Sequence, residues 1–505
     1  LQDEALIRDD NHRLSLYYAA EKGDTTTLKR ILEMDSSLID IKDENGYTPL
    51  MVSSMCGNVD TMKMLLENGA QINHVDKEKH SAVHWAVVCG QLAALTVLLE
   101  KGANANIKDH QGAQPLHYAT VMEDIPPERG EAILHILLKY GALVNGKDVD
   151  GRTPLHWASS NGNAAAIQSL IQAGGNQYEL DRDRLTTLHC AASHGHVNIL
   201  EMLIESSGES IVDWMDRNGD TALFYAVTLA HYECSKFLLM SNANPNHQDY
   251  RLQCPSHCAA AKGQLKILKL LKHYGASFEI QNRRGDIPLH EAIQAGSKDV
   301  VEWLLSLHPS TVNAANHEGR TGLHLSAASG DMELVVLLCT KGAEINPLML
   351  YKGTLYTPLD LAAYKNHTLV VDYLNQRHRA KRADQIPEEQ RIDSTTQLEE
   401  SMQKGMKTNQ RYAHEKAIFQ ELTHLKRVQI QYGKAKEPIL VRSLIGNFCK
   451  MHELNPAYFK FQTFYAWEKF LYDQLSDQLK MIYLEERRRL MNAGRPGAWN
   501  TGKTR

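Results

Sequence analysis

The segment Asp148-Val149-Asp150-Gly151-Arg152-Thr153-Pro154-Leu155-His156-Trp157-Ala158 decides the fold. Gly151 supplies the positive φ of a tight turn, Thr153 can cap a helix, and the proline after it fits the first helical position, where no N–H is needed. Gly162 ends this short helix, and the apolar residues that follow at helical spacing predict a second helix up to Gly174. The segment therefore encodes a turn followed by two short helices.

The same phrase returns along the chain with a period of about 33 residues. A turn with two helices cannot bury its own apolar face, so successive copies must stack on one another as a solenoid. The sequence therefore predicts an all-α solenoid of about eleven helix-turn-helix repeats over residues 1–375. Such a stack offers a long surface for binding rather than a pocket for chemistry. The leucine-type position of the phrase falls at Leu16, Leu50, Val83, Leu116, Leu155, Leu188, Leu223, Ser256, Leu289, Leu323 and Leu359.

Some copies depart from the phrase. His80 and Arg184 are assigned to the place of the turn glycine, so those turns are expected to differ or to be strained. The step from Leu116 to Leu155 is 39 residues, and the extra residues include Pro126-Pro127. We expect them to lengthen the loop between the two helices of the fourth repeat, and lengthened loops in repeat proteins often bind.

Beyond residue 375 the periodicity stops. Phe464, Trp467 and Leu471 recur at helical steps and form one apolar face, which predicts either a helical subdomain or a helix that binds a partner. The region is divided into a polar linker over 376–409, a helical region over 410–492 and a flexible tail over 493–505.

Composition and charge limit the class of protein. Hydrophobic residues make up 43% of the chain and charged residues 23%, as in soluble globular proteins, and no run of about 18 apolar residues predicts insertion into a membrane. Eight cysteines without paired spacing indicate reduced thiols and a cytoplasmic location. Residues 376–505 carry 24 Lys and Arg against 15 Asp and Glu, and residues 1–375 carry 31 against 45. An acidic solenoid with a basic tail follows, and the two can attract each other.

No pattern in the sequence predicts an enzyme or a cofactor. Residues 497–504 match the phosphate-loop pattern G-x-x-x-x-G-K-[ST], but that loop needs a helix after it and only Arg505 follows here. The basic runs over 377–382 and 485–489 are interpreted as solvated helix ends, so nucleic acid is not an expected partner. Cys254, His257 and Cys258 form a local cluster, which we do not expect to bind zinc.

Other singled-out residues receive structural interpretations. Trp85 and Trp157 stand where the phrase usually has a buried leucine, so core packing is expected. Seven histidines share one phrase position and are expected to bridge turn and helix, because repeats lie about 10 Å apart and metal ligands must converge within about 2 Å of one ion. These are His84, His117, His156, His189, His257, His290 and His324.

The turn tips carry the candidate binding residues. In an acidic domain their arginines would form a ladder of guanidinium groups suited to carboxylates or phosphates on an extended ligand. The alternative is that exposed tips are simply polar and that Asp150, Asp183, Asp220 and Asp286 neutralise the ladder. The arginines are Arg152, Arg182, Arg184, Arg217, Arg251, Arg283, Arg284 and Arg320.

The phrases Asn45-Gly46-Tyr47-Thr48-Pro49-Leu50 and Gly151-Arg152-Thr153-Pro154-Leu155-His156-Trp157-Ala158, with Tyr356-Thr357-Pro358-Leu359-Asp360, are typical of ankyrin repeats. The chain is identified by this resemblance as a member of the ankyrin-repeat family. The resemblance implies a non-enzymatic scaffold or adaptor that binds proteins at its turn tips and along the concave side of its first helices.

A narrower resemblance is to the inversin group, ankyrin scaffolds of cilia and planar polarity whose repeats precede calmodulin-binding I-Q motifs. Residues 430–434 begin such a motif but lack its Arg-Gly and distal Arg positions. This resemblance implies a ciliary or cytoskeletal location and a calmodulin-like partner. Two other functions stay open, namely the cytosolic ankyrin arm of a membrane channel and the substrate receptor of a ubiquitin ligase.

Overall fold

The computed structural model describes residues 15–121, 125–207 and 211–407. The chain divides into two compact units, residues 1–243 and residues 244–505, which are described one at a time. The described helices form eleven antiparallel pairs, so the predicted all-α repeat architecture is confirmed. Within these residues no helix is both long enough and apolar enough to cross a membrane.

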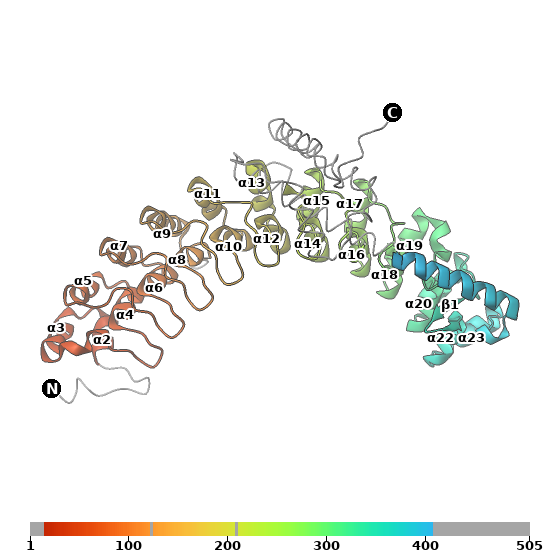
Figure 1. The fold of residues 1–505 in the computed structure, drawn as a ribbon, viewed down its shortest axis with the longest axis horizontal. Helices are drawn as coiled ribbons and strands as arrows, with labels where there is room; N and C mark the ends of the chain where they lie inside the picture. Colours follow the sequence, from red (N-terminus) through yellow and green to blue (C-terminus); the bar gives the residue numbers. More distant parts are fainter. Residues whose placement is uncertain (1–14, 122–124, 208–210, 408–505) are drawn as a thin grey trace, which may run out of the picture. The chain divides into compact units, whose positions relative to one another are not determined.

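Unit 1 contains seven helix pairs (Figure 1). The first helix of each pair packs on the first helix of the next, and the second helix packs on the second. The helices are α2 (Ser15–Lys22), α3 (Thr25–Met34), α4 (Pro49–Cys56), α5 (Val59–Glu67), α6 (Ala82–Val88), α7 (Leu92–Glu100), α8 (Pro115–Tyr118), α9 (Pro127–Lys139), α10 (Pro154–Asn161), α11 (Ala164–Gln172), α12 (Thr187–His194), α13 (Val197–Ser207), α14 (Ala222–Thr228) and α15 (Tyr232–Met240), with a 3-10 helix at Ser36–Asp40.

Unit 2 contains four helix pairs and a short hairpin. Strands β1 (Met349–Tyr351) and β2 (Thr354–Tyr356) are antiparallel, with Met349 opposite Tyr356, and they occupy the long step before the last repeat. The helices are α16 (Pro255–Ala261), α17 (Leu265–His273), α18 (Pro288–Gln294), α19 (Lys298–Leu307), α20 (Gly322–Ser329), α21 (Met332–Thr340), α22 (Pro358–Tyr364) and α23 (Thr368–His378), with 3-10 helices at Pro309–Asn313 and Ala383–Gln385.

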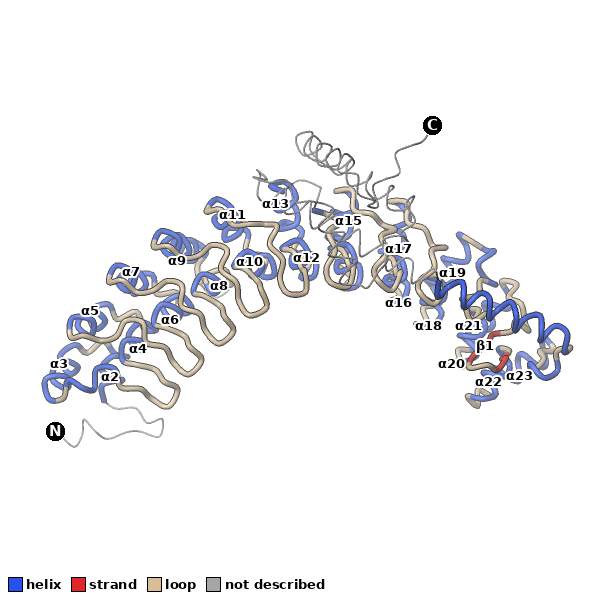
Figure 2. Tube along the Cα trace, viewed as in Figure 1, coloured by secondary structure: helices blue, strands red, loops and turns tan. Residues whose placement is uncertain are grey.

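The repeat phrase folds as its residue types require. Thr153 is the N-cap of α10, Pro154 is its first residue, and Gly162 closes it with a φ of 69°. Leu155 and Ala158 are fully buried between neighbouring repeats. Because alanine is small, adjacent first helices can approach closely, and the loops between repeats extend from the helix pairs (Figure 2).

The segment predicted as a polar linker differs from that expectation. Residues 376–409 include the end of α23, the 3-10 helix Ala383–Gln385 and a helix over 388–407. A polar composition does not exclude a helix whose residues face a neighbouring surface, and the bulk of this segment is helical rather than irregular. The predicted helical region over 410–492 and the tail over 493–505 lie outside the described residues.

Candidate functional site

The turns between repeats form fingers, each of five residues and each beginning with Asp or Asn. In the finger 148–152, Oδ1 of Asp148 accepts hydrogen bonds from the backbone N–H of Asp150 at 3.0 Å and of Arg152 at 2.7 Å. Both hydrogen bonds recur in the fingers 43–47, 181–185 and 216–220 of unit 1 and 249–253, 282–286 and 316–320 of unit 2. In the fingers 76–80 and 109–113 the first aspartate accepts the N–H of the fifth residue. A side chain that satisfies its own turn gives the finger a fixed shape.

The fourth residue of each finger needs a positive φ. Gly151 has a φ of 80°, and Arg184 adopts 64° at the same place, as the sequence predicts. The prediction for His80 was wrong by one position, because the non-glycine residue with a φ of 64° is Lys79. Since Asp76 begins that finger, counting from it gives the correct register. A left-handed conformation costs a residue with a side chain roughly 1–2 kcal/mol.

Neighbouring fingers are joined through their backbones. In unit 1 the N–H of Arg182 donates to the carbonyl of Asp150 at 2.7 Å, and the N–H of Arg217 donates to that of Asp183 at 2.8 Å. In unit 2 the N–H of Arg283 donates to the carbonyl of Arg251 at 2.8 Å. Within each unit the fingers therefore form a continuous hydrogen-bonded row.

Seven histidines link the first helix of their own repeat to the next repeat. Six reach the following finger, and His324 reaches Tyr356 of β2. Nδ1 of His156 accepts the N–H of Thr153 at 3.2 Å, and its Nε2 lies 3.1 Å from the carbonyl oxygen of Leu185. Because a carbonyl oxygen only accepts, Nε2 carries the hydrogen and the ring is neutral. The predicted structural role is thus confirmed and extends to the next repeat. The other rings with this pair of contacts are His84, His117, His189, His257, His290 and His324.

Burial keeps these rings neutral. Removal from water lowers the pKa of His84, His156, His257 and His324 from 6.5 to about 4 each, and the hydrogen bonds to backbone carbonyls oppose the shift only in part. In the last repeat Asp360 replaces the histidine, and its Oδ2 accepts the N–H groups of Thr357 and Ala383, each at 2.9 Å.

Trp85 and Trp157 are half-buried, which corrects the expectation of full core burial. The indole N–H of Trp85 donates to Oδ2 of Asp76 at 3.0 Å, and that of Trp157 donates to Oδ2 of Asp148 at 3.0 Å. Each tryptophan therefore fixes the finger of its own repeat. An indole N–H usually has a partner when it is buried, and this need holds the ring beside the carboxylate instead of in the core.

Two tyrosines make the same contact. The hydroxyl of Tyr118 donates to Asp109 at 2.5 Å, and that of Tyr225 donates to Asp216 at 2.8 Å. Burial, together with the Asp109 carboxylate, raises the pKa of Tyr118 above its usual range, so the hydroxyl stays a donor. The predicted site residues do not include these aromatic donors, although the nine-residue spacing between each aspartate and its donor is visible in the sequence.

Four of the eight predicted arginines lie in unit 1, and two of these form ion pairs. Nε of Arg152 is 3.7 Å from Oδ2 of Asp181 on the next finger. Nη1 of Arg217 is 3.8 Å from Oδ1 of Asp183 on the preceding finger. The alternative of neutralised tips therefore holds at these two arginines.

Arg182 and Arg184, both on the finger 181–185, are exposed, and neither forms an ion pair with another residue of the described part of unit 1. The two carboxylates of this finger, Asp181 and Asp183, form ion pairs with Arg152 and Arg217 of the neighbouring fingers instead. This finger thus presents two guanidinium groups to solvent.

Unit 2 carries the other four arginines. Nη2 of Arg320 is 3.3 Å from Oε2 of Glu318 in its own finger. Arg251, Arg283 and Arg284 are exposed, and neither Arg251 nor Arg284 pairs with a carboxylate among the residues described for this unit. Oδ1 of Asp286 accepts a hydrogen bond from the Asn316 amide at 2.9 Å instead of neutralising an arginine. A binding role for these side chains stays a prediction.

The comparison with known families agrees with this geometry. A family model described as ankyrin repeats in three copies matches residues 16–109, 68–148, 104–178, 161–249 and 256–349. The chain belongs to the ankyrin-repeat family. Its repeats are of the kind that mediates protein–protein interaction, which agrees with a fold that offers a row of fingers.

Individual ankyrin-containing relatives match only part of the chain. The human transient receptor potential cation channel subfamily A member 1 is 27% identical over 26% of this chain and 16% of its own length. Neurogenic locus notch homolog protein 1 of Danio rerio is 30% identical over 27% of this chain and 6% of its own. A glycerophosphocholine phosphodiesterase of Candida albicans is 39% identical over 18% of this chain and 8% of its own. The chain thus covers no more than 16% of any of these three relatives.

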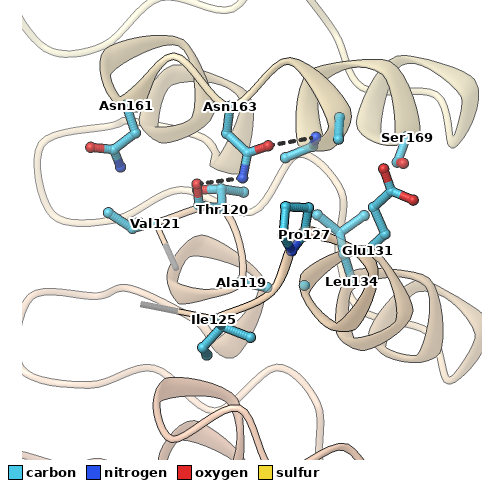
Figure 3. Close-up of a pocket in the computed structure, with 13 residues that line it drawn as sticks. Ala119, Thr120, Val121, Ile125, Pro127, Glu131, Leu134, Asn161, Asn163 and Ser169 are labelled. Carbon is cyan, nitrogen blue, oxygen red and sulfur yellow. Dashed lines mark hydrogen bonds between the residues drawn. The ribbon is translucent and has the colours of Figure 1, made fainter. Parts of the chain in front are cut away.

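The lengthened loop of the fourth ankyrin repeat borders a pocket of about 300 Å³ in unit 1 (Figure 3). Helix α8 ends after four residues and α9 begins only at Pro127, so the loop lies between the two helices as predicted. Ile125 and Pro127 supply apolar walls, and Asn163 donates to the carbonyl of Thr120 at 3.1 Å. Binding at this loop stays a prediction.

The Cys254 cluster has an architectural role. Sγ of Cys254 lies 2.9 Å from Nδ1 of His257, so the thiol takes the capping position that threonine holds in other repeats. Over residues 15–121, 125–207 and 211–407, no group of three His, Cys, Asp or Glu side chains could hold a metal ion. The predicted partner-binding residues Phe464, Trp467 and Leu471, and the phosphate-loop pattern over 497–504, lie outside the described residues.

Proposed function

We propose that this ankyrin-repeat protein is a non-enzymatic scaffold or adaptor whose fingers bind an extended protein segment carrying acidic or phosphorylated side chains. The observation that supports the proposal is that the finger 181–185 combines a fixed backbone with two exposed arginines. Its backbone is fixed by Asp181 and by the neighbouring fingers, while Arg182 and Arg184 remain exposed without an ion pair in the described unit.

The chemistry of arginine favours such a ligand. A guanidinium group binds a carboxylate or phosphate through two parallel hydrogen bonds, and the fixed finger limits the entropy lost on binding. A single exposed ion pair contributes only about 0.2–1 kcal/mol. Useful affinity therefore requires an extended segment that meets several arginines, or a phosphate that meets two at once.

The test for unit 1 is retention of the full chain on an array of synthetic peptides, both acidic and phosphoserine-containing, at several salt concentrations. The double variant Arg182→Glu and Arg184→Glu should lose at least about tenfold in affinity for the peptides that the native chain retains. Arg30→Glu on the outer helix α3 is the matched control, since Arg30 is also exposed. Equal retention of all peptides by the double variant would reject the proposal for this unit.

Unit 2 offers an independent test of the same chemistry. Arg251→Glu with Arg284→Glu should weaken capture of partners that depend on these fingers, with binding through unit 1 unchanged. If capture of every partner is the same as for the native chain, the arginines of unit 2 serve only as polar tips.

The relatives add little about activity. The channel and the phosphodiesterase match over small parts of their length, so neither favours a channel arm or an enzyme over a scaffold. We propose a cytoplasmic location, with cilia and the cytoskeleton as sites to examine, because the eight cysteines of the sequence have no paired spacing. Imaging of the tagged chain beside ciliary and cytoskeletal markers tests this location, and a calmodulin pull-down tests the calmodulin-like partner.

A further inference from the structure

The helix over 388–407 lies against the finger 316–320 of unit 2 and the segment that leads into the hairpin (Figure 1). Its covered residues recur at steps of three and four, so they form one stripe along the helix. All other side chains of the helix are exposed, including Ile392 and Met406, at 59% and 67%. The covered residues are Arg391, Ser394, Thr395, Leu398, Ser401, Met402 and Gly405.

Two close contacts set the register of this helix. A Cβ atom at Gly319 would lie 2.7 Å from Cδ2 of Leu398, so the leucine rests directly on the turn of the finger 316–320. A Cβ atom at Gly405 would lie 2.8 Å from Cδ2 of His317, so the helix backbone rests on the ring of the same finger. A leucine and a glycine seven positions apart therefore meet one finger from the same helix face.

The chemistry of the stripe is not that of a permanent core. Between the helix and the fingers lies a cleft of about 760 Å³, lined mainly by polar side chains. Ser394, Gln397 and Ser401 border it, and none of their side chains has a hydrogen-bond partner among the described residues. Nε of Arg391 is buried without a partner, which costs free energy. By contrast, leucines between repeats, such as Leu323, are completely buried. The helix is therefore held weakly.

The segment before the helix is held firmly. The N–H of Lys381 donates to Asn346 at 2.7 Å, the hydroxyl of Thr357 donates to the carbonyl of Lys381 at 3.0 Å, and Ile386 is buried. This anchor keeps the helix close to the fingers at high effective concentration even though its own contacts are few. Such an arrangement allows another helix to replace the helix over 388–407 on this surface while the repeats stay folded.

We propose that the finger 316–320, together with Leu348 at the start of the hairpin, is a helix-binding surface that the helix over 388–407 occupies in the free chain. The external partner of this surface is an amphipathic α-helix that places an aliphatic side chain on Gly319 and a small residue on His317, seven positions apart. This surface is distinct from the arginine fingers of the proposed function and does not depend on them.

The probe for this surface is a fluorescent synthetic peptide with the sequence of residues 388–407, titrated into the 505-residue chain and followed by fluorescence anisotropy. Leu398→Glu in the chain should release its own helix and increase affinity for the native-sequence peptide by at least about tenfold, since an occupied surface binds in proportion to the fraction that is free. A peptide with Gly405→Leu should not bind, because its side chain meets the His317 ring. A peptide with Gln403→Leu, altered at an exposed position, is the matched control and should bind like the native sequence.

Hydrogen exchange of the same two chains gives a readout that needs no peptide. The amides of residues 316–320 should exchange faster in the Leu398→Glu chain, while those of the finger 282–286 stay unchanged as an internal check on folding. Equal affinity of the native and Leu398→Glu chains for the peptide would overturn the proposal, whether both bind or neither does. Binding of the Gly405→Leu peptide at native strength would overturn the assigned register.

Discussion

Replacing His156 with alanine should destabilise unit 1 by about 4 kcal/mol. The change removes the hydrogen bonds to the N–H of Thr153 and the carbonyl of Leu185, and Thr153 and His156 are completely buried. The carbonyl of Leu185 still accepts the N–H of Asp181 at 3.2 Å, but the N–H and the hydroxyl of Thr153 both lose their bond to the ring. Each buried group left without a partner costs about 1–3 kcal/mol, and these two groups of Thr153 give the estimate. The loss falls on the junction of two repeats, because Leu185 belongs to the finger that follows.

Urea unfolding followed by circular dichroism measures the change, with amide exchange at residues 181–185 as a local readout, because repeat proteins need not unfold in one step. His135→Ala is the matched control, since His135 is exposed on α9 and should cost under about 0.5 kcal/mol. A loss below about 1 kcal/mol for His156→Ala, with unchanged exchange in the following finger, would refute the idea that the ring joins the two repeats.

Three further predictions concern the same architecture. The pKa values of His84, His156, His257 and His324 are about 4 in the folded chain against 6.5 unfolded, so each contributes stability that is complete above pH 6.5 and is lost as pH falls toward 4. Each should lower the unfolding free energy by about 2 kcal/mol between pH 8 and pH 5, and a melting temperature that stays constant over this range would contradict the neutral rings. Trp157→Phe should cost about 1–2 kcal/mol by removing the bond to Asp148, whereas Trp303→Phe, on an outer helix, should cost less in the same thermal melts. Arg184→Gly should raise the unfolding free energy by about 1 kcal/mol, because glycine accepts a positive φ without strain. The same variant should bind acidic peptides more weakly. A decrease in its unfolding free energy would contradict the backbone strain assigned to Arg184.

The repeat phrase predicts the fold because each of its letters has a local physical role. Threonine caps, proline begins a helix, glycine ends one, and histidine closes the turn, so the eleven helix pairs follow from sequence alone. The register of a finger without glycine is harder to predict, as the shift from His80 to Lys79 shows. In such a finger the residue with a positive φ is located by counting from the aspartate that begins the turn.

Contacts between side chains that the repeat phrase does not include were harder to predict. The partner of Trp85 is a carboxylate nine residues away, which the repeat phrase does not include. Leu325 and Leu361, at the same position of the phrase, are half-buried as well. The sequence did not reveal the helix over 388–407, because five of its seven covered residues are arginine, serine, threonine or glycine, a composition typical of a polar linker. Its position depends on the shape of the finger 316–320, which only the folded chain supplies.

Site-specific photo-crosslinking tests most directly whether the arginine fingers bind protein. The crosslinker p-benzoylphenylalanine is placed at position 150, on an exposed finger tip next to Arg182, or at position 168, on the exposed side of α11. Partner adducts should form from position 150, should disappear when Arg182→Glu and Arg184→Glu are added, and should be absent from position 168. Adducts from position 168 alone, or adducts from position 150 that persist in the double variant, would contradict binding through the arginine fingers.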